Sequence, residues 1–187
     1  MSPALSLPAA QFSTPSVDAL ALLPILIVLG AALIGVLVEA FVPRGQRYST
    51  QVVLTVVSLL AAMGSLVVTR DHQGITAGPR PGVDTLKGSV VVDGPTLFLQ
   101  LVILLFAIIA VLTFAERLGG VGSDAFTPMG AATPGSPLEA QARRLGAMTS
   151  EVFPLFLFSV GGMLLFPASG DLLTMFVALE VLSLPLY

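Results

Sequence analysis

One carboxylate lies within an apolar run near the end of the chain. Glu180 comes nine residues after Asp171, and only Leu, Thr, Met, Phe, Val and Ala residues separate the two. A helix rising 1.5 Å per residue would place Glu180 about 14 Å from this polar boundary, near the middle of a hydrocarbon core about 30 Å thick. Burial disfavours the charged form of an acid, and a neighbouring cation or water favours it, so such a group can exchange protons near neutral pH. Glu180 is therefore the candidate for a proton relay.

Ser183 and Pro185, which follow Glu180 in the chain, extend this candidate site. Pro185 has no N–H to donate to the carbonyl of Val181, and its ring crowds that carbonyl, so we expect a bend just past Glu180. Ser183 shares a helix face with Glu180 and can bond to its carboxylate or to water. We expect Ser183 and Pro185 to form a hydrated helix break. In the alternative interpretation, Glu180 makes an interhelical bond that serves packing alone.

Composition places the whole chain in a membrane. Of 187 residues, 55% are hydrophobic and 10% are charged, and the mean hydropathy is +0.97. A water-soluble domain with a polar surface does not reach these values. The net charge of -3 is dispersed, so no nucleic-acid partner is indicated. The absence of cysteine and the single histidine exclude thiolate metal sites, iron–sulfur ligation and bis-histidine haem, so redox chemistry is expected on other chains.

Five largely apolar stretches must position Glu180. They predict an all-α polytopic bundle of five membrane-spanning helices, at 20–42, 51–69, 95–114, 152–168 and 171–187. The two-residue link Ser169-Gly170 requires the last two helices to form an antiparallel pair. We expect those two helices to make up the segment 151–187, with the first three in 19–115.

The connecting segments are polar or rich in Gly and Pro. We expect a mobile tail at 1–18, a basic turn at 43–47, a polar hairpin loop at 70–94 with a short strand at its Val triplet, and a loop at 116–150 with a short surface helix at 137–145. The tail, the 70–94 loop and the 169–170 turn fall on one side of the membrane. The other side carries five of the eight Lys and Arg residues. The positive-inside rule then predicts an inner (plasma) membrane protein with its N-terminus outside and its 116–150 loop cytoplasmic.

Polar and small residues inside the spans predict helix contacts. We expect Gln100 to make an interhelical hydrogen bond rather than bind a transported ion, and Glu39 to lie at the membrane interface. Small residues that allow close approach are Ala31 and Gly35 in the first helix, Ser58, Ala61, Ala62 and Ser65 in the second, and Gly161 and Gly162 in the fourth.

The run Asp171-Leu-Leu-Thr-Met-Phe-Val-Ala-Leu-Glu180-Val-Leu-Ser183-Leu-Pro185-Leu-Tyr187 resembles the fifth-helix signature of subunit N of the proton-translocating NADH:quinone oxidoreductase, respiratory complex I. The related subunits M and L and the Mrp-type antiporter subunits share the glutamate but generally lack the combined Asp and Glu-x-x-Ser-x-Pro-x-Tyr. The approach to the third helix at 90–94 is also similar to this family. The Gly/Pro-rich 117–147 insert is unlike the family's usual short connection.

The resemblance implies the N-terminal part of an antiporter-like membrane-arm subunit, built in the family from about fourteen helices with inverted repeats, so that the fifth helix here is truncated. It implies that Glu180 belongs to a proton pathway and pairs with a lysine on a later helix outside this sequence. FMN, iron–sulfur clusters and quinone are then expected on other subunits, and the partners are other membrane-arm subunits and the lipid bilayer. Two alternatives stay open: a monovalent cation/proton antiporter subunit and a non-conducting scaffold.

Overall fold

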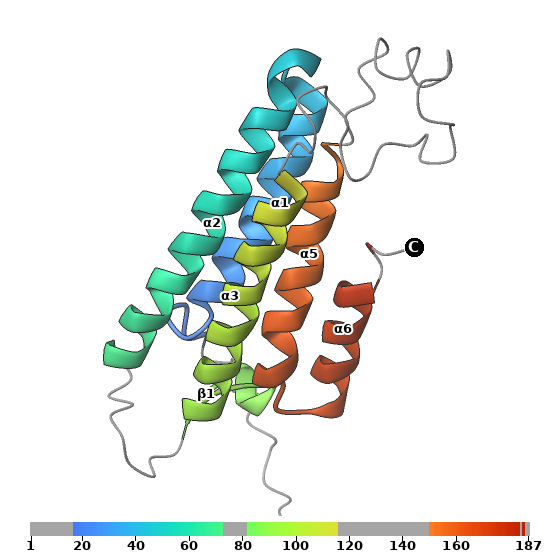
Figure 1. Ribbon diagram of the computed structural model, residues 1–187. Coiled ribbons are helices and arrows are strands. Elements are labelled where there is room, and N and C mark those ends of the chain that lie inside the picture. The colour runs from blue at the N-terminus through green and yellow to red at the C-terminus, as the bar shows by residue number, and fades with distance from the viewer. Residues whose placement is uncertain (1–16, 73–81, 116–149, 184, 186–187) are drawn as a thin grey trace, which may run out of the picture.

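The computed structural model describes residues 17–72, 82–115, 150–183 and 185 (Figure 1). The predicted mobile tail up to residue 16, the rest of the 70–94 loop at 73–81, and the predicted loop and surface helix within 116–149 lie outside these ranges. The described residues form a bundle of long helices with a small β-hairpin at one end. The helices are α1 Leu23–Phe41, α2 Arg44–His72, α3 Gly94–Ala115, α5 Val152–Leu165 and α6 Leu172–Ser183.

Three of these helices are long and apolar enough to cross a membrane. They are α1, α2 and α3, and the segments that are long and apolar enough are Leu23–Phe41, Arg44–Asp71 and Gly94–Thr113. The remaining two are apolar but have only 14 and 12 residues, or about 21 and 18 Å at 1.5 Å per residue. A hydrocarbon core is about 30 Å thick. The prediction of five helices is confirmed, but only three of them have the length of a complete span.

The α1–α2 connection is shorter than expected. The predicted basic turn at 43–47 is wrong, because α2 already begins at Arg44 and continues to His72. Proline is well accommodated at a helix start, and the Arg and Gln residues that follow Pro43 are good helix formers. Arg47 also donates from Nε to the carbonyl of Val42 at 2.6 Å. The first helix begins at Leu23, three residues later than predicted. A turn separates Asp18 from this helix start.

Aspartate side chains accept backbone hydrogen bonds at one end of the bundle. Asp18 Oδ1 accepts hydrogen bonds from the N–H groups of Leu20 and Ala21, so this residue is fixed rather than part of a mobile tail. Asp93 Oδ1 caps α3 through the N–H of Thr96 at 2.8 Å. A carboxylate at a helix start satisfies amide groups that lack an intrahelical partner.

The Val triplet does form a strand, so the all-α prediction is wrong in this detail. Strand β2 (Val90–Val92) pairs antiparallel with β1 (Val83–Thr85). The short 3₁₀ turn η1 (Leu86–Gly88) joins them, and its residues Leu86 and Lys87 have φ of 55° and 58°. Such left-handed backbone is unfavourable for residues with a Cβ.

The two ends of the bundle hold the segments that the alternating topology predicts (Figure 1). At one end the hairpin contacts the start of the chain through Asp18 N–H and Thr85 Oγ1, 2.9 Å apart. At the other end Tyr48 donates to the carbonyl of Ala115 at 3.2 Å, and its ring meets Phe153 edge-on, with centroids 5.6 Å apart. The described connections therefore gather at the two ends of the bundle as predicted, and which end faces the cytoplasm stays a prediction.

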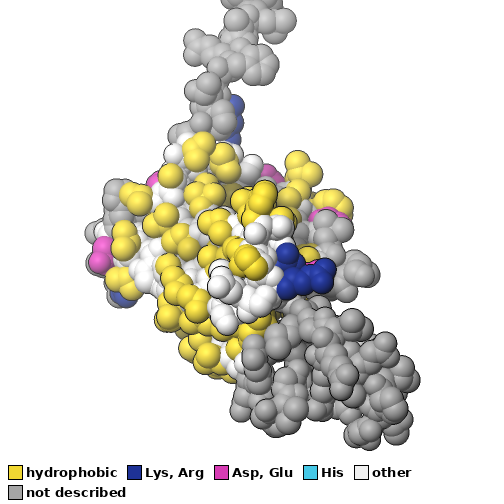
Figure 2. All heavy atoms as spheres, turned by 90° about the horizontal axis from the view of Figure 1, so that it is seen from above, with side chains coloured by type: hydrophobic (Ala, Val, Ile, Leu, Met, Phe, Trp, Pro, Cys, Tyr) yellow, Lys and Arg dark blue, Asp and Glu magenta, His cyan; other side chains and the backbone are white. Residues whose placement is uncertain are grey.

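Small residues bring the helices together where expected. Ala31, Gly35, Ser58, Ala62 and Ser65 are buried; Ala61 is exposed, and its predicted contact is wrong. The outer surface instead presents large apolar side chains, among them Leu33, Phe98 and Phe106. Hydrophobic side chains also predominate in the end view of Figure 2. This apolar exterior is that of a membrane protein.

Candidate functional site

Helix α6 carries the predicted relay residue on its exposed side. Ala178 is the fully buried residue of this helix, whereas Glu180 is exposed. Its neighbours Phe176, Val177 and Leu179 are exposed as well. Glu180 therefore lies on an apolar surface that the described helices leave uncovered, and its role as a proton relay stays a prediction. Among the described residues, its carboxylate has neither an ion pair nor a hydrogen bond.

Ser183 lies near Glu180 but does not bond to its carboxylate. The serine hydroxyl is 3.4 Å from the backbone carbonyl oxygen of Glu180, a long contact within one helical turn. Helix α6 ends at Ser183. Leu184, which separates it from Pro185, lies outside the described residues, so the predicted bend and its hydration stay predictions.

α6 is held against α5 as the short link predicts (Figure 1). A Cβ at Gly162 would lie 2.5 Å from the N of Leu182 and 2.8 Å from the O of Ala178, so these backbones touch through the glycine. Ser159 Oγ donates to the carbonyl of Leu182 at 3.1 Å. The backbone on both sides of Glu180 is thus fixed to α5, while the Glu180 side chain remains outside the contact.

The start of α6 is fixed a second time, by the hairpin. Gly170 N–H donates to the carbonyl of Ser89 at 2.8 Å, and Val90 forms an isolated β-bridge with Ser169. Asp171 Oδ1 accepts from the Thr174 N–H at 2.6 Å. This backbone bond first, and then the side chains of Ser89 and Thr174, lower the pKa of Asp171 below its ordinary value of 3.8. Asp171 is therefore a structural cap at the start of α6.

Gln100 makes the predicted interhelical bond. Its Nε2 donates to the carbonyl of Leu164 in α5 at 3.0 Å, and the side chain is fully buried. At this level of α5 the chain turns into the 3₁₀ segment η2 (Phe166–Ala168), where Thr96 Oγ1 donates to the Pro167 carbonyl at 3.1 Å. Two polar side chains of α3 thus hold the end of α5.

A second polar group, which the sequence analysis did not single out, joins α1 to α2. Gln51 Nε2 donates to the Gly35 carbonyl at 2.7 Å and to Glu39 Oε1 at 2.9 Å. Arg47 Nη1 lies 3.8 Å from the other oxygen of Glu39. Glu39 is thus at the helix end, as predicted for an interfacial residue, and is mostly buried. An uncharged polar residue at the very start of a predicted span was the available signal.

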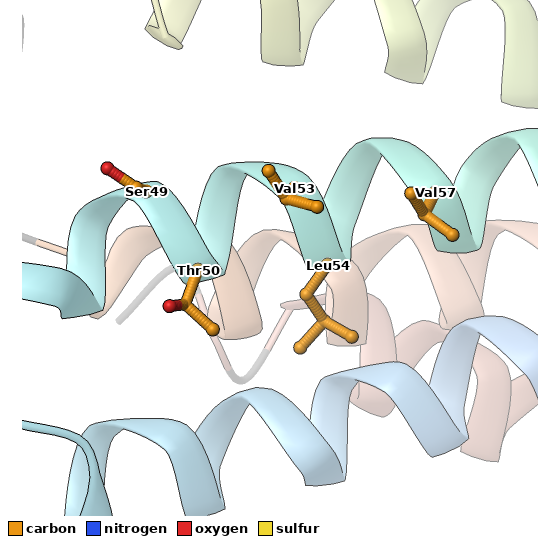
Figure 3. Close-up of a pocket in the computed structure, with 5 residues that line it drawn as sticks. All are labelled: Ser49, Thr50, Val53, Leu54 and Val57. Carbon is orange, nitrogen blue, oxygen red and sulfur yellow. The ribbon is translucent and has the colours of Figure 1, made fainter.

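The groove in Figure 3 contains no ionisable group. It has a volume of about 520 Å³ and is lined by Ser49, Thr50, Val53, Leu54 and Val57, all from α2. In the described ranges, no cluster of three His, Cys, Asp or Glu residues is arranged to hold a metal ion.

Comparison with known proteins identifies the relatives of this chain. No family model matches it. It is 47% identical over 188 residues to NADH-quinone oxidoreductase subunit N 3 of Streptomyces griseus, covering 96% of this chain and 33% of the relative. Subunit N of Beutenbergia cavernae is 50% identical over 180 residues, covering 95% and 34%. Subunit N of Rhodococcus opacus is 51% identical over 197 residues, covering 95% and 35%.

The chain spans about a third of the length of the curated relatives it matches. The match includes almost the whole chain, from the first helices to the Glu180 segment, and it lies in the N-terminal part of the relatives. Over nearly its entire length, this chain is homologous to the N-terminal third of NADH-quinone oxidoreductase subunit N.

Proposed function

We propose that this chain is part of a membrane-arm subunit of NADH:quinone oxidoreductase and takes part in proton translocation coupled to quinone reduction, with Glu180 as the protonatable residue. The observation that carries the proposal is the exposed carboxylate of Glu180 on the apolar side of α6. An acid in an apolar helix of a membrane protein faces protein or a hydrated cavity rather than lipid. We therefore expect the uncovered side of α6 to meet protein from outside the described helices, or a hydrated cavity that such protein encloses.

The length of the relatives supports a source for that protein within the same subunit. They are about three times as long as this chain. We infer that helices following α6 in the complete subunit cover Glu180 and supply the lysine that the resemblance implies. Together with that cation, Glu180 forms a pair whose proton affinity changes as its partner moves, which is the requirement for a switch. α5 and α6 then complete their crossing of the membrane within this larger bundle.

The redox chemistry belongs to other subunits in this proposal. FMN, iron–sulfur clusters and quinone bind there, and the present chain supplies no cysteine for a cluster. Its partners are the neighbouring membrane-arm subunits and the bilayer.

Glu180→Gln in the assembled complex tests the role of this carboxylate. Proton pumping into proteoliposomes and NADH:quinone reduction are measured together, with Glu180→Asp as the variant that keeps an acid. We expect Gln to lower the number of protons moved per NADH and Asp to retain most of it. Unchanged proton stoichiometry would sink the proposal. Loss of assembly with normal turnover per assembled complex would favour the scaffold, and sodium-dependent transport without coupling to quinone reduction would favour the antiporter.

Sidedness is tested with single cysteines, because these 187 residues contain none of their own. We propose that the hairpin end faces outward and the Arg44 end faces the cytoplasm. In intact cells, a membrane-impermeant maleimide should label Lys87→Cys and leave Arg44→Cys unlabelled until the membrane is opened. The reverse pattern would invert the topology.

A further inference from the structure

A row of polar side chains lies along the buried side of α2. Gln51, Thr55 and Thr69 are fully buried, and Ser58 and Ser65 are nearly so. Three of the five are satisfied within the protein: Ser58 donates to the carbonyl of Thr55, Ser65 to that of Ala62, and Thr69 to that of Leu20 in the turn before α1. The other two, Gln51 and Thr55, differ.

The side-chain oxygen Oε1 of Gln51 has no hydrogen-bond partner among the described residues. Both of its hydrogen-bond contacts are made by Nε2, to the Gly35 carbonyl and to Glu39 Oε1. Since both partners are acceptors, the amide must present its NH₂ to them, which fixes Oε1 on the other side. In the part of the chain that the structure describes, Oε1 has no hydrogen-bond partner.

Thr55 repeats this situation one turn further along α2. Its Oγ1 is buried and lacks a partner among the described residues. Residues four apart lie on the same helix face, so the two oxygens occupy adjacent turns of the same buried side. A buried polar atom without a partner is costly, and one in a membrane bundle is costlier because lipid cannot replace water.

We propose that Gln51 Oε1 and Thr55 Oγ1 bind an internal water molecule. The ligand must donate to the amide oxygen and must be small. A Cβ at Gly35 would lie 3.1 Å from Gln51 Oε1 and 3.0 Å from Pro154 Cβ, so α1, α2 and α5 converge closely there. Water meets both requirements and can donate to Gln51 while also bonding to the threonine hydroxyl.

A monovalent cation fits the site between Gln51 Oε1 and Thr55 Oγ1 less well than water does. The two oxygens are neutral, and the nearby carboxylate of Glu39 is already opposed by Arg47. The water also has a structural consequence, because it extends the polar series Arg47, Glu39 and Gln51 inward to Thr55. This hydrated site lies on α2, and it does not depend on Glu180 or on the proposed function.

The direct test is water-edited solid-state NMR of the full chain in liposomes, with threonine and glutamine isotopically labelled. We expect rapid magnetisation transfer from water protons to Thr55 Cβ and Gln51 Cδ. Ser65, whose hydroxyl is bonded to its own helix, is the buried control in a serine-labelled sample. Transfer to Thr55 no faster than to Ser65 would overturn the proposal, as would a Thr55 shift that follows sodium concentration and marks a cation.

The second test asks whether the Tm falls or rises when the Thr55 hydroxyl is removed. Thr55→Val keeps the shape and removes the hydroxyl. If water is bound, Thr55→Val removes one of its hydrogen-bond partners, and we expect the Tm of the chain to fall by about 2–4 °C. Thr55→Ser keeps a hydroxyl and should avoid most of this fall. If the site is dry, valine removes an unsatisfied group and the Tm stays or rises, which would contradict the proposal. Ser65→Ala is the matched control and should change the Tm by less than about 1 °C. Should Thr55→Val fail to fold, the NMR comparison on the natural sequence still decides.

Discussion

Gln100 in the middle of one apolar helix donates its amide N–H to the backbone carbonyl of Leu164 in another, at 3.0 Å and out of contact with solvent. The bond joins α3 to the last turn of α5, directly before the chain turns toward α6. A bond of this kind fixes the register of two helices that otherwise contact through apolar side chains. It therefore contributes to where α6 begins.

Gln100→Leu should destabilise the protein by about 1 kcal/mol, the range found for interhelical hydrogen bonds in membranes. The loss stays modest because leucine also removes the need to bury an amide. Thermal unfolding followed by circular dichroism measures it. Thr113→Val is the control, since the Thr113 hydroxyl bonds to the Ile109 carbonyl of its own helix on an exposed face. Equal effects of the two changes would contradict the role of the α3–α5 bond.

Gly162→Ala should displace α6. The added Cβ would meet the backbone of Ala178 and Leu182, and backbone cannot yield as a side-chain tip can, so we expect a cost of about 1–3 kcal/mol. A spin-label distance between α5 and α6 should lengthen at the same time. Gly64→Ala is the matched control, because no atom lies within 4 Å of a Cβ there. It should be neutral or stabilise α2 by up to about 1 kcal/mol. An unchanged α5–α6 distance in Gly162→Ala would refute the contact.

The Asp171 cap should make stability depend on pH in acid. Its pKa is lowered in the folded protein, chiefly by the hydrogen bond from the Thr174 N–H. A lowered folded pKa means that the stabilisation is fully present above the ordinary value of 3.8 and is lost as the pH falls through the folded value. Asp171→Asn should remove this part of the pH dependence, so the gap in unfolding midpoint between Asp and Asn proteins should shrink between pH 6 and pH 3. A gap that widens with acid would contradict the assignment.

Lys87→Gly should stabilise the hairpin turn. Lys87 has a φ of 58°, where a Cβ is unfavourable and glycine is not. We expect a gain of about 0.5–1 kcal/mol in the free energy of unfolding. Asp84→Gly is the control, since Asp84 is an exposed residue in the regular strand β1, and glycine there should destabilise. A loss of stability in Lys87→Gly would show that the lysine side chain itself contributes more than the backbone strain costs.

The sequence by itself determined the apolar helices, their alternation between two ends, the Val triplet strand and the position of a carboxylate in the last helix. Each follows from local composition: apolar length predicts a helix, a Val triplet predicts a strand, and a two-residue link forces an antiparallel pair. Gln100 could be predicted as a contact because an amide inside an apolar helix needs a partner. The error at the 43–47 turn has the same local origin, since helix-forming residues after Pro43 outweighed their charge.

Only the tertiary structure decided which way the polar groups face. Gly162 and Ser159 hold the Ala178 and Leu182 side of α6 against α5 and leave the Glu180 carboxylate on the open side. The partners of Gln51 are set only by the fold, in which the Gly35 carbonyl and the Glu39 carboxylate of α1 accept from its amide. Residue types set the need for a partner; the rotation of each helix, fixed by contacts between residues far apart in the chain, decides which partner it finds.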